Sequence, residues 1–155
     1  MIDPSQFREL IVGPTLKSMD AWSLAAEDLL MGTAMQESGL RFLKQLAGGP
    51  ALGVYQMEPA TADDIWTNYL AHRKELADKV SSFGMSRLVE NQYAGNLYYA
   101  TAMCRVHYMR VSEPLPDAGD AVGMGRYWKK HYNTVLGAGK AIEFVESFDK
   151  VVSHG

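Results

Sequence analysis

The stretch that decides the fold class reads, from residue 20 to residue 39, Asp20-Ala21-Trp22-Ser23-Leu24-Ala25-Ala26-Glu27-Asp28-Leu29-Leu30-Met31-Gly32-Thr33-Ala34-Met35-Gln36-Glu37-Ser38-Gly39. Its apolar side chains recur at helical spacing between Trp22 and Met35, which predicts a helix with an extensive apolar face. Asp20 is expected to cap this helix and Gly39 to end it, because a glycine accepts the left-handed backbone of a helix C-terminus.

Glycine and proline separate further helical segments on both sides of this stretch. A first helix is expected to start at Asp3-Pro4, with an interruption at Gly13-Pro14, and another at Glu58-Pro59. Ser86 is expected to cap a long apolar helix from about Arg87 to Arg110, and Asp117 to open the next helix. Gly137-Ala138-Gly139 then separates that helix from a last one through Ile142, Val145 and Phe148. The helical period fails between Gly39 and Gly53, where Gly48-Gly49-Pro50 predicts a turn-rich loop or a small β-excursion. The fold class is therefore mainly α, with at most a small β-hairpin.

Composition limits the size and the partners of the molecule. The 155 residues are 47% hydrophobic and 21% charged, which fits a single domain spanning residues 1–155. A formal net charge of −3 argues against a nucleic-acid partner. One cysteine, Cys104, excludes an internal disulfide framework and a cysteine-based zinc site. The four histidines, His72, His107, His131 and His154, show no metal-ligand spacing, so no metal and no cofactor is expected.

The N-terminus indicates where the chain is made. It begins Met1-Ile2-Asp3, with an acidic residue where a signal peptide carries a basic region, and no stretch approaches the length of a membrane helix. We therefore expect synthesis in the host cytoplasm without membrane insertion, with a partner or an assembled particle carrying the chain elsewhere.

Glu37 is the residue whose position suggests chemistry. It follows Leu30, Ala34 and Met35 at the C-terminal end of an apolar helix, so partial burial and the helix dipole both favour its protonated form. A carboxylic acid that stays protonated near neutral pH is what general-acid cleavage of a glycosidic bond requires. The alternative interpretation is a solvated glutamate near a helix end.

Three motifs follow one another in the sequence. They are Glu37-Ser38-Gly39, then Gly53-Val54-Tyr55-Gln56-Met57-Glu58-Pro59-Ala60-Thr61-Ala62, then Asn91, Gly95 and Tyr98 on the expected long helix. A fourth motif is met in part by Tyr132-Asn133-Thr134. In this order they resemble the motifs of the lysozyme-like superfamily, specifically those of the soluble lytic transglycosylases and goose-type lysozymes. The resemblance covers residues from about Ala21 to Tyr108 and implies an α+β lysozyme-like domain.

The resemblance implies an enzyme that cleaves the β-1,4 bond between N-acetylmuramic acid and N-acetylglucosamine in peptidoglycan. Glu37 is then the catalytic acid and base, and the expected substrate-binding residues are Ser38, Tyr55, Gln56, Tyr98, Tyr132 and Asn133. Ser38 can hold the acid in place, the Gln56 amide suits an N-acetyl group, and the tyrosines offer flat faces to sugar rings. Core packing is the alternative for each tyrosine, and a helix-end cap for Asn133.

Glu58 leaves the reaction type open. Lytic transglycosylases lack a second catalytic carboxylate and close a 1,6-anhydro ring on the muramyl sugar, whereas a second carboxylate can position water for hydrolysis. Glu58 is the first carboxylate after Glu37, but it also precedes Pro59 at a helix start, where the dipole favours an acid. We expect transglycosylation, with muramidase activity as the alternative.

The segments around Tyr127-Trp128 and Tyr132-Asn133-Thr134 resemble C-terminal parts of phage muralytic proteins. A phage endolysin exported through a holin, or a lysin carried by the virion, is the setting that this implies. Two alternative interpretations involve no enzymatic activity. The domain could be a lysozyme-like component of a virion or secretion system that serves assembly or glycan binding, or a helical adaptor whose motif matches arise by chance. The basic and aromatic run from Arg126 to His131 is expected to be a solvated helix face with its apolar back on the core.

Overall fold

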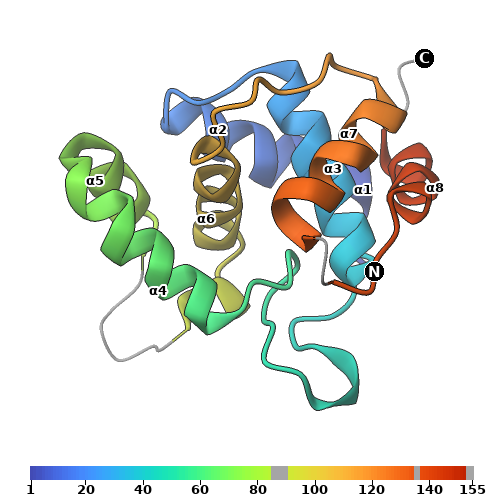
Figure 1. Cartoon of the computed structure of the whole chain (residues 1–155). Helices are drawn as coiled ribbons and strands as arrows, with labels where there is room; N and C mark the ends of the chain where they lie inside the picture. Colours follow the sequence, from blue (N-terminus) through green and yellow to red (C-terminus); the bar gives the residue numbers. More distant parts are fainter. Residues whose placement is uncertain (85–90, 135–136, 153–155) are drawn as a thin grey trace.

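The computed structural model describes residues 1–84, 91–134 and 137–152, and helices make up most of them (Figure 1). The helices are α1 (Pro4–Phe7), α2 (Gly13–Ser18), α3 (Leu24–Ser38), α4 (Pro59–Asn68), α5 (Lys74–Ser82), α6 (Leu97–Met109), α7 (Ala121–Trp128) and α8 (Ala141–Val151). Single π-helical turns lie at Arg8–Val12 and Lys129–Asn133, and 3-10 turns at Leu46–Gly48, Leu70–His72 and Gln92–Ala94. The described residues contain no sheet and form one compact domain, so the expected mainly α class is confirmed.

Helix α3 lies at the centre of the molecule. Nearly every side chain from Ala26 to Ala34 is buried, since α8, α6 and α7 all pack against this helix. Figure 1 shows α8 on one side of α3, α6, α4 and α5 on the other side, and α7 in front of α3. The last turn of α3 carries Glu37 and leads into the segment that connects α3 to α4.

The C-terminal end of α3 agrees with the prediction from the sequence, and the N-terminal end does not. Gly39 ends the helix in a left-handed conformation with φ of 61°, as predicted. The helix begins later than predicted, because Asp20 lies in a turn before it, itself with a positive φ of 54°. The N-cap is Ser23, whose hydroxyl accepts the backbone N–H of Ala26 at 3.0 Å.

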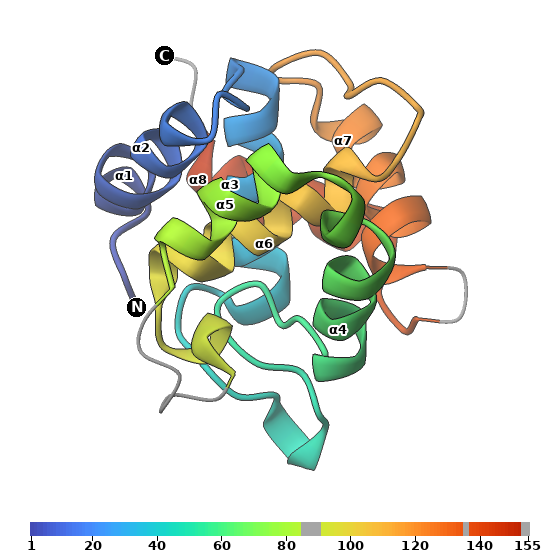
Figure 2. The same ribbon diagram turned by 90° about the vertical axis from the view of Figure 1, so that its left-hand side faces the viewer.

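An irregular segment connects α3 to α4 and projects from the bottom of the molecule in Figures 1 and 2. It contains isolated antiparallel bridges that join Lys44 to Leu52 and Leu52 to Met57, without a named strand. The small β-excursion predicted between Gly39 and Gly53 is confirmed in this minimal form.

The first helical segment runs on where an interruption at Gly13-Pro14 was predicted. The Gly13 N–H bonds to the carbonyl of Arg8, which widens the chain into one π-helical turn just before Pro14. The proline then stands in the first turn of α2, where a missing N–H costs little. The chain therefore stays helical from Pro4 to Ser18, with a change from α-helical to π-helical hydrogen bonding between Arg8 and Val12.

The long helix predicted from about Arg87 to Arg110 is shorter. Asn91 has a left-handed φ of 52°, and the Asn96 side chain caps α6 by accepting the Tyr99 N–H at 3.0 Å. Helix α6 therefore begins at Leu97, and the predicted cap Ser86 lies outside the described residues. Asn91 and Gly95, which the third motif placed on a helix, lie in the turn before it.

Helix α7 also begins later than the predicted start at Asp117. Its N-cap is Asp120, whose carboxylate accepts the Gly123 N–H at 3.0 Å. The last helix, α8, is confirmed, but its buried face differs in part from the prediction: Phe144 and Phe148 are buried, whereas Ile142 is 62% exposed.

Candidate active site

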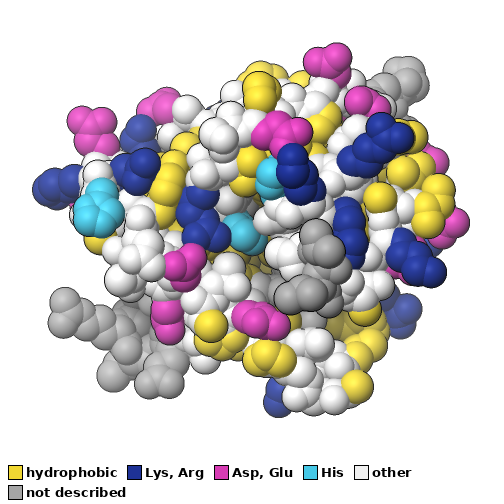
Figure 3. Space-filling view, in the orientation of Figure 1, with side chains coloured by type: hydrophobic (Ala, Val, Ile, Leu, Met, Phe, Trp, Pro, Cys, Tyr) yellow, Lys and Arg dark blue, Asp and Glu magenta, His cyan; other side chains and the backbone are white. Residues whose placement is uncertain are grey.

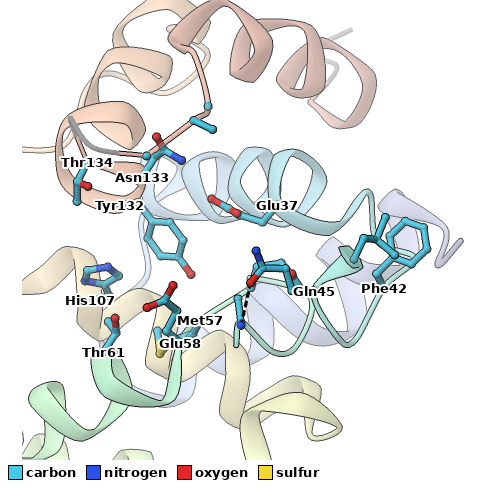
Figure 4. Close-up of a pocket in the computed structure, with 16 residues that line it drawn as sticks. Glu37, Phe42, Gln45, Met57, Glu58, Thr61, His107, Tyr132, Asn133 and Thr134 are labelled. Carbon is cyan, nitrogen blue, oxygen red and sulfur yellow. Dashed lines mark hydrogen bonds between the residues drawn. The ribbon is translucent and has the colours of Figure 1, made fainter. Parts of the chain in front are cut away.

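A pocket of about 580 Å³ opens beside the C-terminal end of α3. Its wall comes from α3, the projecting segment, the start of α4, α6 and the segment after α7: Glu37, Phe42, Gln45, Leu46, Ala51, Gln56, Met57, Glu58, Thr61, His107, Tyr132, Asn133, Thr134, Gly137, Ala138 and Gly139. Figure 4 shows how the labelled side chains converge from both sides, and Figure 3 shows the hollowed surface near the centre of this face. This volume falls in the range of small-molecule sites.

Glu37 is the acid in this pocket. Burial raises the pKa of its carboxyl from 4.5 to about 7, although the Trp128 indole N–H, which donates to Oε1 at 3.0 Å, pulls the pKa down. No described cation forms an ion pair with Glu37. The burial and the raised pKa predicted for this residue are confirmed, and they leave it protonated in a large fraction of molecules at neutral pH.

The second motif brings Gln56 and Glu58 to the opposite wall. Gly53, with φ of 78°, lets the chain pass so near Tyr93 that an added Cβ would lie 2.2 Å from its carbonyl oxygen. Gln56 also has a positive φ of 48°, and its side-chain amide donates to the Gly53 carbonyl at 2.9 Å. Glu58 is exposed and makes no side-chain cap hydrogen bond to α4, although it precedes Pro59. Glu58 thus lines the pocket and is also the N-cap residue of α4, where the helix dipole favours an acid.

The fourth, partial motif also reaches the pocket. The Tyr132 hydroxyl donates to the Tyr55 carbonyl at 2.6 Å, and its ring stacks on Tyr108 with centroids 5.3 Å apart. Asn133 accepts a hydrogen bond from the Lys129 ammonium at 2.7 Å. Both side chains line the pocket, and these contacts hold them in place.

Three residues predicted to bind substrate lie elsewhere. Ser38 is buried, and its hydroxyl donates to the Ala34 carbonyl, so it braces the helix end and does not line the pocket. The Tyr55 ring is 1% exposed and its hydroxyl pairs with Thr101 at 2.9 Å, so this tyrosine is a core residue. Tyr98 is 45% exposed and lies outside the pocket wall. The burial of Ser38 and Tyr55 favours the structural alternative for these two residues, whereas the exposed Tyr98 stays a prediction outside this pocket; the spacing of a motif alone does not say which of its residues face the core.

Two residues at the pocket were not singled out from the sequence. Trp128 lies in the run from Arg126 to His131, which was expected to turn its apolar back to the core; it is 1% exposed, and the contact that the sequence did not predict is its indole N–H donating to Glu37. It precedes Tyr132 by one helical turn, so the partial match at Tyr132 carried a signal for it. His107, set aside with the other histidines, lines the pocket from α6.

No cluster of three or more metal-ligating side chains occurs within residues 1–84, 91–134 and 137–152. Among the same residues, no helix has the length and apolarity that crossing a bilayer requires. Comparison with protein-family models, with curated proteins and with solved structures found no match to this chain. The geometry of the pocket and the sequence motifs are therefore the observations that bear on function.

Proposed function

We propose that this chain is a peptidoglycan lytic transglycosylase that cleaves the β-1,4 bond between N-acetylmuramic acid and N-acetylglucosamine. The observation that carries the proposal is Glu37, a carboxyl with a pKa of about 7 in an open pocket of about 580 Å³. A general acid works best when its pKa lies near the working pH, and a carboxyl reaches that value when it is removed from water.

The rest of the pocket wall suits a carbohydrate. The amides of Gln45, Gln56 and Asn133 can each donate and accept hydrogen bonds, as sugar hydroxyl and acetamido groups require. The rings of Phe42 and Tyr132 add apolar surface of the kind that packs against the face of a sugar. No cofactor is needed for this chemistry.

The proposed reaction uses Glu37 twice. Its proton passes to the glycosidic oxygen while the bond from that oxygen to C1 of the muramyl sugar breaks. The substrate's own acetamido group assists at C1, as the family resemblance implies. The muramyl 6-hydroxyl then bonds to C1, and its proton returns to the Glu37 carboxylate. The acid is regenerated and no water is consumed.

Hydrolysis is the second candidate, and one observation favours it. Glu58 lines the same pocket as Glu37, and its exposed carboxylate makes no cap to α4, so it is free to orient a water. Two carboxylates on opposite sides of a cleft are the usual equipment of a glycoside hydrolase.

The fold-level proposal is that the domain has the lysozyme-like arrangement. Supporting it, Glu37-Ser38-Gly39 closes a buried central helix, and the projecting segment that follows carries the only β-bridges within the described residues. The second motif then returns to the pocket at Gln56 and Glu58. The order of the buried helix, the bridged segment and the returning motif is the one that the family resemblance implies.

Digestion of purified peptidoglycan tests the proposal. We expect soluble muropeptides that carry an anhydro ring and are lighter by one water than hydrolysis products, as measured by mass spectrometry. Reducing muramyl ends instead would assign hydrolysis, and Glu58→Gln should then lower the rate. Full activity of Glu37→Gln would remove the proposed mechanism, whichever product forms.

A further inference from the structure

A three-residue chain runs from the pocket wall to the surface through α6 and α4. The His107 Nδ1 lies 2.9 Å from the Arg110 guanidinium, and the other arm of that guanidinium pairs with the Asp64 carboxylate at 2.6 Å. His107 and Arg110 are three residues apart on one face of α6, and Asp64 approaches from α4. Asp64 is held in turn by the Asn68 amide at 2.6 Å.

The contact with Arg110 decides which ring nitrogen of His107 carries the proton. A guanidinium only donates hydrogen bonds, so Nδ1 must accept and the proton of the neutral ring must sit on Nε2. No hydrogen bond from a described residue reaches Nε2, and the ring is part of the pocket wall. Figure 4 shows His107 beside Thr61, on the same side of the pocket as Glu58.

The surroundings of His107 also keep the ring neutral. Burial lowers its pKa to about 4, and the cation of Arg110 and the nearby His131 act in the same direction, while Asp64 opposes them. The Tyr132 ring, 4.7 Å away between centroids, contributes no charge at neutral pH. A charged imidazolium in the pocket would favour ionised Glu37, so a neutral ring is compatible with a protonated acid in the same cavity.

We propose that the Nε2–H of His107 is a neutral hydrogen-bond donor to a sugar oxygen in the Glu37 pocket, and that Arg110 is a positioning residue that fixes this tautomer. The inference rests on the proposed function, since it names a further substrate contact of the same site. Neither residue belongs to the three motifs or to the partial fourth one. A donor that stays neutral binds a hydroxyl or acetamido oxygen without attracting anions.

Nitrogen-15 NMR of the full chain tests the donor directly. The Glu37→Gln variant is titrated with a soluble tetrasaccharide of alternating N-acetylglucosamine and N-acetylmuramic acid, and the His107 Nε2–H and Trp128 indole N–H signals are followed. We expect His107 in the Nε2–H tautomer, with both signals moving as sugar binds. A shift at Trp128 without one at His107 overturns this inference and leaves the proposed function standing. No shift at either, together with no cleavage by wild type, removes both.

Kinetics supply a second measurement that a purely structural role would not reproduce. His107→Phe keeps a ring but loses the donor, and we expect kcat/KM to fall roughly 2- to 10-fold, mainly through KM. His107→Gln places an amide N–H near the Nε2 position and should recover most of the loss. His72→Phe is the matched control, because that histidine is exposed and lies outside the pocket wall. Equal rates for His107→Phe and the control would overturn the inference.

Discussion

The two ends of α3 each bury acidic side chains beside a tryptophan, and they treat the charge in opposite ways. At the N-terminal end, Glu27 accepts the Trp22 indole N–H at 2.6 Å and pairs with Arg8 at 2.7 Å. The other arm of Arg8 pairs with Asp28 at 2.7 Å. At the C-terminal end, Glu37 accepts the Trp128 indole N–H at 3.0 Å, and no described cation pairs with it.

The difference separates carboxylates that are stabilised as anions from a carboxyl that burial favours in its protonated form. Glu27 and Asp28 lie in the first half of α3, where the helix dipole and Arg8 both favour negative charge. Glu37 lies at the opposite end, where the dipole disfavours it, and burial raises its pKa to about 7. An uncompensated acid costs folding free energy, and such groups concentrate at functional sites. The same residue type, with the same indole donor, thus indicates two roles.

Removal of the carboxyl at each end should give the largest difference between the two ends. Glu37→Gln should lower the rate of peptidoglycan cleavage by roughly 10²- to 10⁴-fold, since it deletes the only proton donor that the mechanism uses. Glu27→Gln should leave the rate per folded molecule near that of wild type, because Glu27 lies outside the pocket wall. Rates would be measured at a temperature where circular dichroism shows both variants folded. A large loss of rate in Glu27→Gln would erase the distinction between the two ends.

Removing the cation at the N-terminal end should be the largest change in stability. Arg8→Met leaves Glu27 and the fully buried Asp28 without their cation, and we expect a loss of about 3–5 kcal/mol in the free energy of unfolding. Denaturant unfolding gives this quantity. Lys79→Met is the matched control, since the ion pair of Lys79 with Asp20 is exposed and should be worth less than about 1 kcal/mol. Similar losses in the two variants would show that Arg8 does not compensate a buried charge.

The two ends also differ in what the sequence predicted. Helical spacing, the Gly39 stop and the Glu37-Ser38-Gly39 motif were enough to predict a partly buried acid at the end of α3. The Arg8 contact was not predictable, because it joins residues 19 and 20 positions apart through a turn whose geometry depends on the whole fold. The sequence left Tyr55 open between sugar binding and core packing for a related reason: its partner Thr101 is 46 positions away in the chain, so the burial of this tyrosine depends on the whole fold.

The free energy of unfolding should depend on pH through the ionisation of Glu37. The folded-state pKa of Glu37, about 7, exceeds its unfolded value of 4.5, so the folded protein is favoured while the carboxyl is protonated in both states. That contribution is lost as the pH rises from 4.5 through about 7, to a total of about 3 kcal/mol.

Comparing wild type with Glu37→Gln in denaturant across this range isolates the effect. The two proteins should differ least below pH 4.5, and the variant should become relatively more stable as the pH rises from 4.5 to about 7, above which the difference should level off. A constant difference across the range would mean that the carboxyl is not buried in its ionised form. Glu27→Gln is the control, and it should not reproduce this gain.

The smallest expected effect concerns the tryptophan donors, which are the feature that both ends share. The Trp128 indole lowers the pKa of Glu37, so Trp128→Phe should raise that pKa and move the alkaline limb of the activity profile to higher pH. Trp22→Phe should leave the limb in place, since its indole bonds to Glu27. Phenylalanine keeps a ring against Phe144, which packs 5.6 Å from Trp128 between centroids, so the fold should survive. A limb that moves to lower pH in Trp128→Phe would mean that the indole does not stabilise the ionised acid, and the electrostatic contrast between the two ends would then need another cause.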